Sequence, residues 1–341
     1  MPVILPSVTR VHPNFVDPGL ILQYNQASGA FDTLATGDPM VKLGSDDLYV
    51  YMRALRVRTQ IAAGQASYNL LPSCVVEGTE VSTPTYLFQN RYDYSHHDVS
   101  AGTRWGISVP EALRRGSRQG HFQQLRGALL YGMNPQNGEG LINAPGATAI
   151  NLPPDSNSND TLLTYDNGQL ALFFLQEITN IQIAMFQLGL PTRVVILGPQ
   201  RILGTMSQVN VVQLTQYQRQ GAGTGTTASL IDDIMSKANG TVEWAYDDTL
   251  IGKGQNGHDM VIITVPEINV PKGTGKITTA EFNELQPSQD ACNLMYLDMA
   301  APREIPTPVA GGVIDTLVEL RGTSGWPIRP EATVLLSVQY S

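Results

Sequence analysis

The stretch Ser108–Pro145, SVPEALRRGSRQGHFQQLRGALLYGMNPQNGEGLINAP, decides how the rest of this chain is interpreted. Ser108 is followed three residues later by Glu111, a capping box in which each side chain can satisfy a free backbone N–H of the first helical turn. A helical pattern continues to about Gly132, and the segment ends in GEGLINAP, whose glycines interrupt the helix. The sequence therefore predicts a long helix over 106–132 that runs into a bend.

The predicted helix has one cationic side and one side of small residues. Each glycine inside a helix costs about 1 kcal/mol relative to alanine, so three retained glycines predict the close approach of another backbone. The cationic side has two interpretations: a solvated face that pairs with acidic neighbours, which is the commoner case, or a surface near nucleic acid. The cationic residues are Arg114, Arg118 and Arg126, and the small side holds Leu113, Gly116, Gly120 and Gly127.

The composition is that of a globular chain with an unusually uncharged surface. The 341 residues are 42% hydrophobic and 15% charged, below the usual value of about 25%, and a chain of this length has a prior of about two domains. Because interface cores are depleted in charge, we expect much of the exterior to become protein–protein interface. The net charge of −9 excludes a dedicated nucleic-acid-binding protein, which normally carries a strong basic footprint.

The two cysteines and the hydropathy pattern bear on the compartment. Cys74 and Cys292 lie far apart in the sequence, without metal-ligand spacing, and predict free thiols in a reducing environment. No apolar run reaches the roughly 18 residues of a membrane span, and the first residues lack a signal-peptide pattern. We therefore expect synthesis in the cytoplasm and no contact with a membrane.

No motif predicts a catalytic, cofactor-binding or metal-binding residue, so the chain is not expected to be an enzyme. His96-His97-Asp98 is the nearest approach to a metal site, but adjacent side chains of a strand point to opposite faces. The loops Gly221–Gly225 and Gly273–Lys276 lack the spacing of phosphate-binding motifs, and Ser324 is misplaced for a hydrolase elbow. A soluble α/β enzyme with a nucleotide at one of the glycine loops remains the alternative from another class; it requires a water-excluding pocket.

The helix and the bend together resemble a known family, the major capsid proteins of tailed bacteriophages and the related encapsulins, which share the Hong Kong 97-type fold. The residues that carry the resemblance are Tyr131-Gly132 and Gly138–Pro145, with Ile142 where leucine is commoner. The order of elements is similar over nearly the whole chain. The resemblance implies an α+β fold with an N-terminal arm, an extended β-hairpin loop, a peripheral domain with a long spine helix, and an axial α/β domain.

The resemblance divides the chain into six segments. The proline-rich residues 1–45 form the arm, and 46–64 start the peripheral domain as either a short helix or a strand. Residues 65–105 form the hairpin loop, 106–132 the spine helix, 133–290 the axial domain, and 291–341 strands that return to the peripheral domain beside the helix. No separate domain is expected before the arm, so a scaffolding function would belong to another protein.

Aromatic side chains mark the expected hairpin. Tyr86, Phe88, Tyr92 and Tyr94 fall on even positions, the two-residue period of a strand with one apolar face. In family terms this strand laps over the adjacent subunit; the alternative is an ordinary hairpin that packs on its own domain. Some capsids of this fold form lysine–asparagine cross-links from this loop, but no lysine lies between Gln60 and Arg104, so that reaction is not expected here.

Period and turn residues predict the elements of the remaining chain. A turn is expected at Asn256-Gly257, and loops at Pro271–Thr278 and Ala301–Pro308. Helices are predicted at Gln169–Leu188, Gln200–Gln208 and Ser229–Ala238, and strands at Arg193–Leu197, Thr241–Tyr246, Asp259–Pro266, Asn293–Asp298, Gly312–Leu320 and Thr333–Gln339.

The function implied by the resemblance is mechanical. Copies of the chain would form hexamers and pentamers of an icosahedral shell that encloses phage double-stranded DNA, assembled in the host cytoplasm and found in the virion. Scaffolding, portal and decoration proteins are further expected partners, DNA contact would be non-specific, and an encapsulin-like compartment is the structural alternative. The residues assigned to assembly are Tyr86, Phe88, Tyr92 and Tyr94 in the lapping strand, Arg114, Arg118 and Arg126 on the helix, and Gly140, Leu141 and Asn143 at the bend.

Overall fold

The computed structural model describes residues 34, 43–44, 46–58, 75–104, 106, 108–184, 192–208, 226–237, 240–268, 295–296, 302–327 and 330–341. Nearly all of the expected arm, both cysteines and both glycine loops lie outside the described residues. The chain divides into two compact units: unit 1 includes 89–121 and 303–319, and unit 2 includes 27–88, 122–302 and 320–341.

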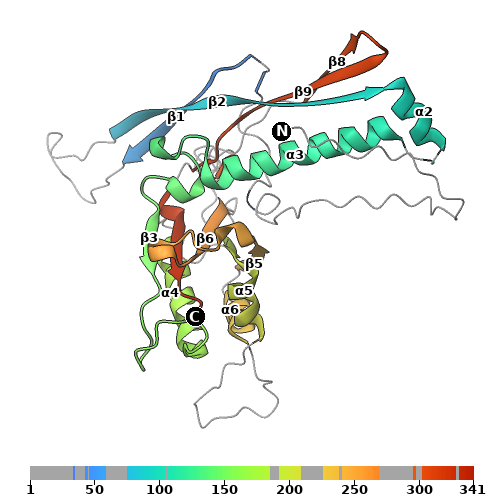
Figure 1. Cartoon of the computed structure of the whole chain (residues 1–341). Coiled ribbons are helices and arrows are strands. Elements are labelled where there is room, and N and C mark those ends of the chain that lie inside the picture. The colour runs from blue at the N-terminus through green and yellow to red at the C-terminus, as the bar shows by residue number, and fades with distance from the viewer. Residues whose placement is uncertain are drawn as a thin grey trace, which may run out of the picture. The chain divides into compact units, whose positions relative to one another are not determined.

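Figure 1 shows the helices and strands in chain order. They are β1 Tyr49–Arg58, β2 Val75–Ser95, α2 His96–Arg104, α3 Val109–Tyr131, β3 Thr148–Asn151, α4 Asn167–Ala184, β4 Thr192–Gly198, α5 Gln200–Gln208, α6 Thr227–Lys237, β5 Thr241–Tyr246, β6 Asp259–Ile268, β7 Met295–Tyr296, β8 Arg303–Val309, β9 Val313–Thr323, β10 Trp326–Pro327 and β11 Thr333–Val338.

Helix α3 confirms the long helix that the sequence predicts. It runs without interruption from Val109 to Tyr131 (Figure 1). The backbone N–H of Ala112 donates to the carbonyl of Ser108 at 3.0 Å, which places Ser108 at the N-cap. The carboxylate of Glu111 accepts from the guanidinium of Arg115 at 3.3 Å. The residues up to His121 belong to unit 1 and the remainder to unit 2.

A four-stranded sheet has the order β1-β2-β9-β8. β1 pairs antiparallel with β2, so of the two interpretations offered for 46–64 the strand holds at Tyr49–Arg58, and the base of this hairpin lies at Tyr49 and Pro84. The predicted loop Ala301–Pro308 is wrong, because β8 occupies it and pairs antiparallel with β9. Its two prolines are tolerated because β8 is an edge strand, where a missing N–H on the outer side breaks no ladder bond.

The expectation that His96 and His97 lie on a strand is also wrong, because both begin helix α2. The reason is a capping box: the hydroxyl of Ser95 accepts from the N–H of Asp98 at 3.2 Å, and the carboxylate of Asp98 accepts from the N–H of Ser95 at 3.0 Å. The bonds from Ser95 hold the pKa of Asp98 below its usual value. This S-x-x-D pattern was the available sequence signal for the helix.

Unit 2 contains a five-stranded sheet of order β3-β11-β6-β4-β5. β6 runs antiparallel to β11 and β4, whereas β3 is parallel to β11 and β5 is parallel to β4. The predicted strands and helices at β4, α5, α6, β5 and β6 are confirmed. The strand predicted at Thr333–Gln339 is present as β11, which lies between β3 and β6, and its Leu335 packs with Leu129 and Leu130 at the end of α3.

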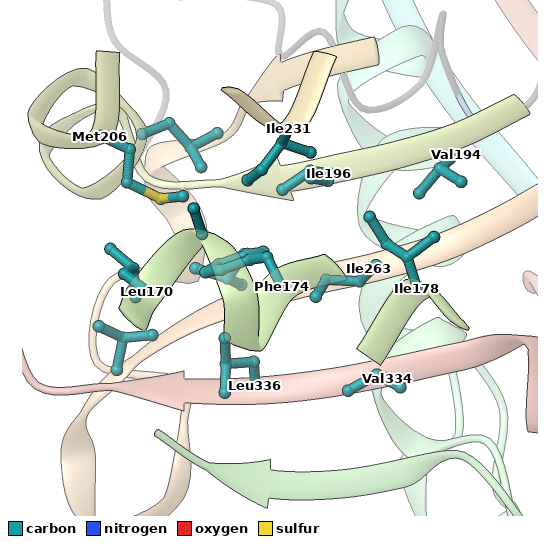
Figure 2. Packing of buried hydrophobic residues seen from close by; sticks show 14 of the residues in the cluster. Leu170, Phe174, Ile178, Val194, Ile196, Met206, Ile231, Ile263, Val334 and Leu336 are labelled. Atoms are coloured by element: carbon teal, nitrogen blue, oxygen red, sulfur yellow. The ribbon is translucent and has the colours of Figure 1, made fainter. Parts of the chain in front are cut away.

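Both faces of this sheet are buried, because successive side chains of each strand point to opposite sides. On one face, Leu170, Phe174 and Ile178 of α4 pack against alternate residues of the sheet, and α5 and α6 join them (Figure 2). The other face is covered by Leu129 and Leu130 at the end of α3. The sheet residues on the α4 side include Val194, Ile196, Ile263, Val334 and Leu336, and those on the α3 side include Val195, Leu197, Ile262 and Leu335.

Candidate functional site: the helix, the bend and the hairpin base

The bend after α3 is built on glycines with left-handed backbone. Gly132 directly follows the helix with φ +70°, and Gly138 and Gly140 have φ +76° and +86°. Residues with a side chain avoid this region, so the glycine spacing that marks the bend in the sequence has a direct conformational cause. One-turn helices at Pro135–Asn137 and Leu141–Asn143 fill the interval.

Three backbone segments meet at the bend without room for side chains. A Cβ on Gly140 would lie 2.5 Å from the carbonyl carbon of Tyr131, and one on Gly132 would lie 2.5 Å from that of Glu139. The third segment follows β9: Gly325 donates its N–H to the carbonyl of Ala128 at 2.9 Å and accepts from the N–H of Gly140 at 2.8 Å. The bend is thus locked to the end of α3 from both sides.

The other predicted bend residues stabilise the same joint. The side-chain amide of Asn143 donates to the carbonyl of Tyr131 at 2.8 Å and to that of Glu139 at 3.0 Å, so it satisfies a carbonyl at the helix end. Leu141 is fully buried with Leu129 and Leu130. Because Leu141 lies inside its own chain, it stabilises the joint and presents no surface to a neighbour.

The arginine side of α3 is paired with an acidic neighbour. In unit 1, the guanidinium groups of Arg114 and Arg118 lie 2.8 and 3.5 Å from one carboxylate, that of Glu304 on β8. The bond with Glu304 raises the pKa of Arg114. The segments 89–121 and 303–319 hold six arginines and six acidic residues. Arg126 belongs to unit 2, where it lies near Tyr131.

The glycines inside α3 meet no backbone of another element in the described part of the chain. Among the described residues, nothing lies within 4 Å of a Cβ built on Gly116 or Gly127, and only the side-chain amide of Asn90 lies near Gly120, at 3.6 Å. The predicted close approach is therefore not made by the described part of this chain. The glycines leave open space beside the helix.

The aromatic face of β2 divides between the two units. Phe88 is buried in unit 2 against Leu125, Ala128 and Leu320, and Tyr86 packs beside it. These two residues therefore pack on their own helix, which is the alternative to a strand that laps over a neighbour. In unit 1, the rings of Tyr92 and Tyr94 stack with centroids 6.5 Å apart.

Sequence reasoning missed an exposed apolar surface at the base of the hairpin. Tyr49 and Tyr51 are 56% and 63% exposed, with ring centroids 6.2 Å apart; Leu48 and Leu87, which the pairing register places on the opposite face, are also exposed. Soluble monomers rarely leave such groups clustered in water. The signal was the alternating pattern of Tyr49–Tyr51, which was interpreted as either helix or strand.

The described residues contain no group of three or more histidines, cysteines or acidic residues placed to hold a metal ion. The rings of His96 and His97 lie 3.9 Å apart at the start of α2. Within the described part of the chain, no helix is both long and apolar enough to cross a membrane.

A buried histidine on α3 predicts a pH dependence of stability. His121 is buried beside β9, and no described residue pairs with its Nε2 atom. Burial lowers the pKa of His121, against the opposing effect of its bond with the backbone of Val318. Because the folded state prefers the neutral ring, stability is full above the unfolded pKa of about 6.5 and is lost as the pH falls through the folded pKa.

We expect the free energy of unfolding to fall less with acid in His121→Asn than in the unmodified chain, because asparagine does not titrate. The free energy of unfolding in urea is measured between pH 8 and pH 5 for the unmodified chain and for His121→Asn. The difference between the two pH profiles gives the contribution of His121, because the other histidines contribute equally to both. Parallel profiles for the two proteins would contradict the assignment.

Comparison with known proteins gives a likeness of structure only. No protein-family model and no curated protein sequence matches the chain. Among solved structures, the capsid of Myoviridae phage XM1 matches 95% of this chain and 96% of its own, with a TM-score of 0.61 and 12% identity. The capsid of a native GTA particle matches 99% and 98%, with a TM-score of 0.57 and 10% identity.

A structure from Gordonia phage Cozz matches 97% of this chain and 92% of its own, with a TM-score of 0.53 and 13% identity. These likenesses extend over nearly the full length of the chain. The chain therefore has the Hong Kong 97-type fold of phage capsid proteins.

Proposed function

We propose that this chain is a major capsid protein, whose copies assemble into hexamers and pentamers of an icosahedral shell around phage double-stranded DNA. The observation that carries the proposal is the nearly full-length likeness to phage and GTA capsid structures. The work of such a subunit is geometric, so no catalytic residue is required. Its place would be the virion, after assembly in the host cytoplasm.

Surface features of the monomer support self-assembly. The exposed apolar residues at the hairpin base, Tyr49 and Tyr51 among them, gain stabilisation if copies cover them. At roughly 25 cal/mol per Å², several interfaces of about 1,600 Å² each make individually weak contacts collectively strong. The open space beside Gly116 and Gly127 would accept a closely approaching backbone of a neighbour.

Contact with the enclosed DNA is proposed to be weak and non-specific. Arg114 and Arg118 share the carboxylate of Glu304, which removes part of the positive charge that phosphate contacts would use. Scaffolding, portal and decoration proteins belong to the same proposal as partners. A compartment shell that encloses protein cargo is the second candidate, because the fold by itself does not distinguish the contents.

Electron microscopy of the expressed chain, combined with size-exclusion chromatography, tests the proposal. We expect closed particles of uniform diameter, each built from many copies of the chain. Nuclease-resistant DNA recovered with particles from infected cells supports a genome capsid, whereas a co-purifying protein cargo supports the compartment. A discrete monomer or dimer at every concentration, with and without candidate scaffolding proteins, would contradict both.

The helix glycines give a test that separates folding from assembly. In Gly116→Ala the new methyl group meets open space, so we expect the monomer to gain up to about 1 kcal/mol in unfolding free energy from helix propensity. If a neighbour's backbone approaches there, the yield of particles falls despite the gain. Gly204→Ala on α5 is the matched control, because its Cβ also meets open space. Equal yields for the two variants would show that no neighbour approaches Gly116.

A further inference from the structure

The side chain of Glu139 lies in the bend and is only 8% exposed. Carboxylates are seldom buried unless hydrogen bonds or counter-charges replace the lost water. The surroundings of Glu139 supply three neutral donors from three segments, all within unit 2. In the sequence, Glu139 stands inside the glycine-rich pattern of the bend, and that pattern gives it no role.

Both oxygens of the Glu139 carboxylate accept hydrogen bonds. Oε2 accepts from the hydroxyl of Ser324 at 2.7 Å and from the N–H of Asn134 at 3.0 Å. The oxygen of Ser324 in turn accepts from the N–H of Met133 at 3.0 Å. On this side, the carboxylate is therefore held to the bend and to the segment that follows β9.

Oε1 of Glu139 reaches a different element. It accepts from the hydroxyl of Tyr86 on β2 at 2.7 Å. Burial, together with the bond to Glu139, raises the pKa of Tyr86 to about 12, so the phenol keeps its proton and remains the donor. The apolar contacts of Phe88 with α3 are non-directional, whereas this O–H···O bond specifies one position of the strand relative to the bend.

We propose that Glu139 is a latch that sets the position of the hairpin base through the hydroxyl of Tyr86. Its Oε2 atom anchors the carboxylate to the rigid bend, and its Oε1 atom holds β2. Release of Tyr86 frees the base of the hairpin while the bend and the five-stranded sheet stay folded. The inference rests on the proposed function, because the position of the hairpin matters for the particle only if copies assemble.

Tyr86→Phe removes the latching hydroxyl and nothing else, and Tyr246→Phe is the matched control, because Tyr246 on β5 is exposed in the same unit and has no assigned role. Hydrogen exchange of the unassembled chain is measured at the amides of Tyr49–Arg58 and Thr83–Phe88, and at those of β4 and β6. We expect Tyr86→Phe to accelerate exchange at the hairpin base by about tenfold or more, as for loss of one hydrogen bond to a charged acceptor. Exchange in β4 and β6 stays within about twofold, because their packing does not involve this bond.

Particle formation is the second readout, with the same two variants and Glu139→Gln. Glu139→Gln keeps the shape but replaces one acceptor oxygen by an NH₂ group, so it is expected to loosen the hairpin base as Tyr86→Phe does. The proposal predicts that Tyr86→Phe and Glu139→Gln give few or misshapen particles and that Tyr246→Phe assembles normally.

Unchanged exchange at the hairpin base in Tyr86→Phe would overturn the latch, and so would a loosened hairpin base with normal particles. If the unmodified chain forms no particle at all, the proposed function fails instead, and the exchange experiment still reports on the bond by itself. A uniform acceleration in every strand would show that Tyr86 acts only on global stability, which also contradicts the proposal.

Discussion

Gly140→Ala is expected to lower the free energy of unfolding by about 4 kcal/mol or more, enough to unfold a protein of ordinary marginal stability. A left-handed φ of +86° costs a residue with a side chain about 1–2 kcal/mol. The larger part comes from the clash, because the added Cβ would lie 2.5 Å from the carbonyl carbon of Tyr131 and 2.8 Å from the carbonyl oxygen of Leu130. Both atoms belong to the helix end and cannot move aside without breaking it.

Gly257→Ala is the matched control for this change. Gly257 also has a positive φ, +78°, but nothing described lies within 4 Å of its Cβ position. We therefore expect the free energy of unfolding of Gly257→Ala to fall by only about 1–2 kcal/mol, the conformational cost of a left-handed residue with a side chain. Urea unfolding of the two variants separates strain from clash; equal losses would show that the three backbones do not meet as closely as the structure has them.

The second large effect is expected for Leu141→Ala, which should cost about 2–5 kcal/mol. Leu141 is fully buried between the end of α3 and one face of the five-stranded sheet, next to Leu129 and Leu130. Truncation leaves a cavity that the backbone, held at Gly140 and Asn143, cannot close. Since Leu141 is internal, we expect the loss already in the unassembled chain.

Leu163→Ala is the control for the truncation, because Leu163 is 56% exposed in the same unit. The free energy of unfolding of Leu163→Ala should change by no more than about 0.5 kcal/mol, as for other surface substitutions. Thermal or urea unfolding measures both. A small effect at Leu141 with a large defect in particle formation would show instead that this residue acts at a subunit interface.

Elements with a strong local pattern were predictable. The apolar stripe of α4, with Leu170, Phe174 and Ile178, and the apolar run of β4 are both confirmed. In each case the spacing of apolar residues within one segment was enough to predict which of its side chains are buried. Capping and glycine signals placed both ends of α3 within a few residues. The role of the bend as a joint followed from its glycines, although that of Glu139 did not.

The errors arose where a local signal has more than one tertiary meaning. Pro306 and Pro308 indicated a loop, yet an edge strand accepts them equally well. The aromatic stripe that begins at Tyr86 indicated one buried face without saying whether the cover is the chain's own helix or a neighbour. The pairing of β11 was not predictable, because strand pairing joins residues far apart in sequence, such as Val334 and Ile263.

By itself, the sequence determined the long helix, the glycine bend and the alternating strands, because period, capping and backbone freedom are properties of neighbouring residues. Only the tertiary structure decided that Tyr86 and Ser324 meet at the carboxylate of Glu139, and that Gly325 closes on the end of α3. These contacts join segments up to 238 residues apart, counted from Tyr86 to Ser324. Their geometry is set by the packing of whole elements against one another, and such packing produces no repeating pattern of residues in the sequence.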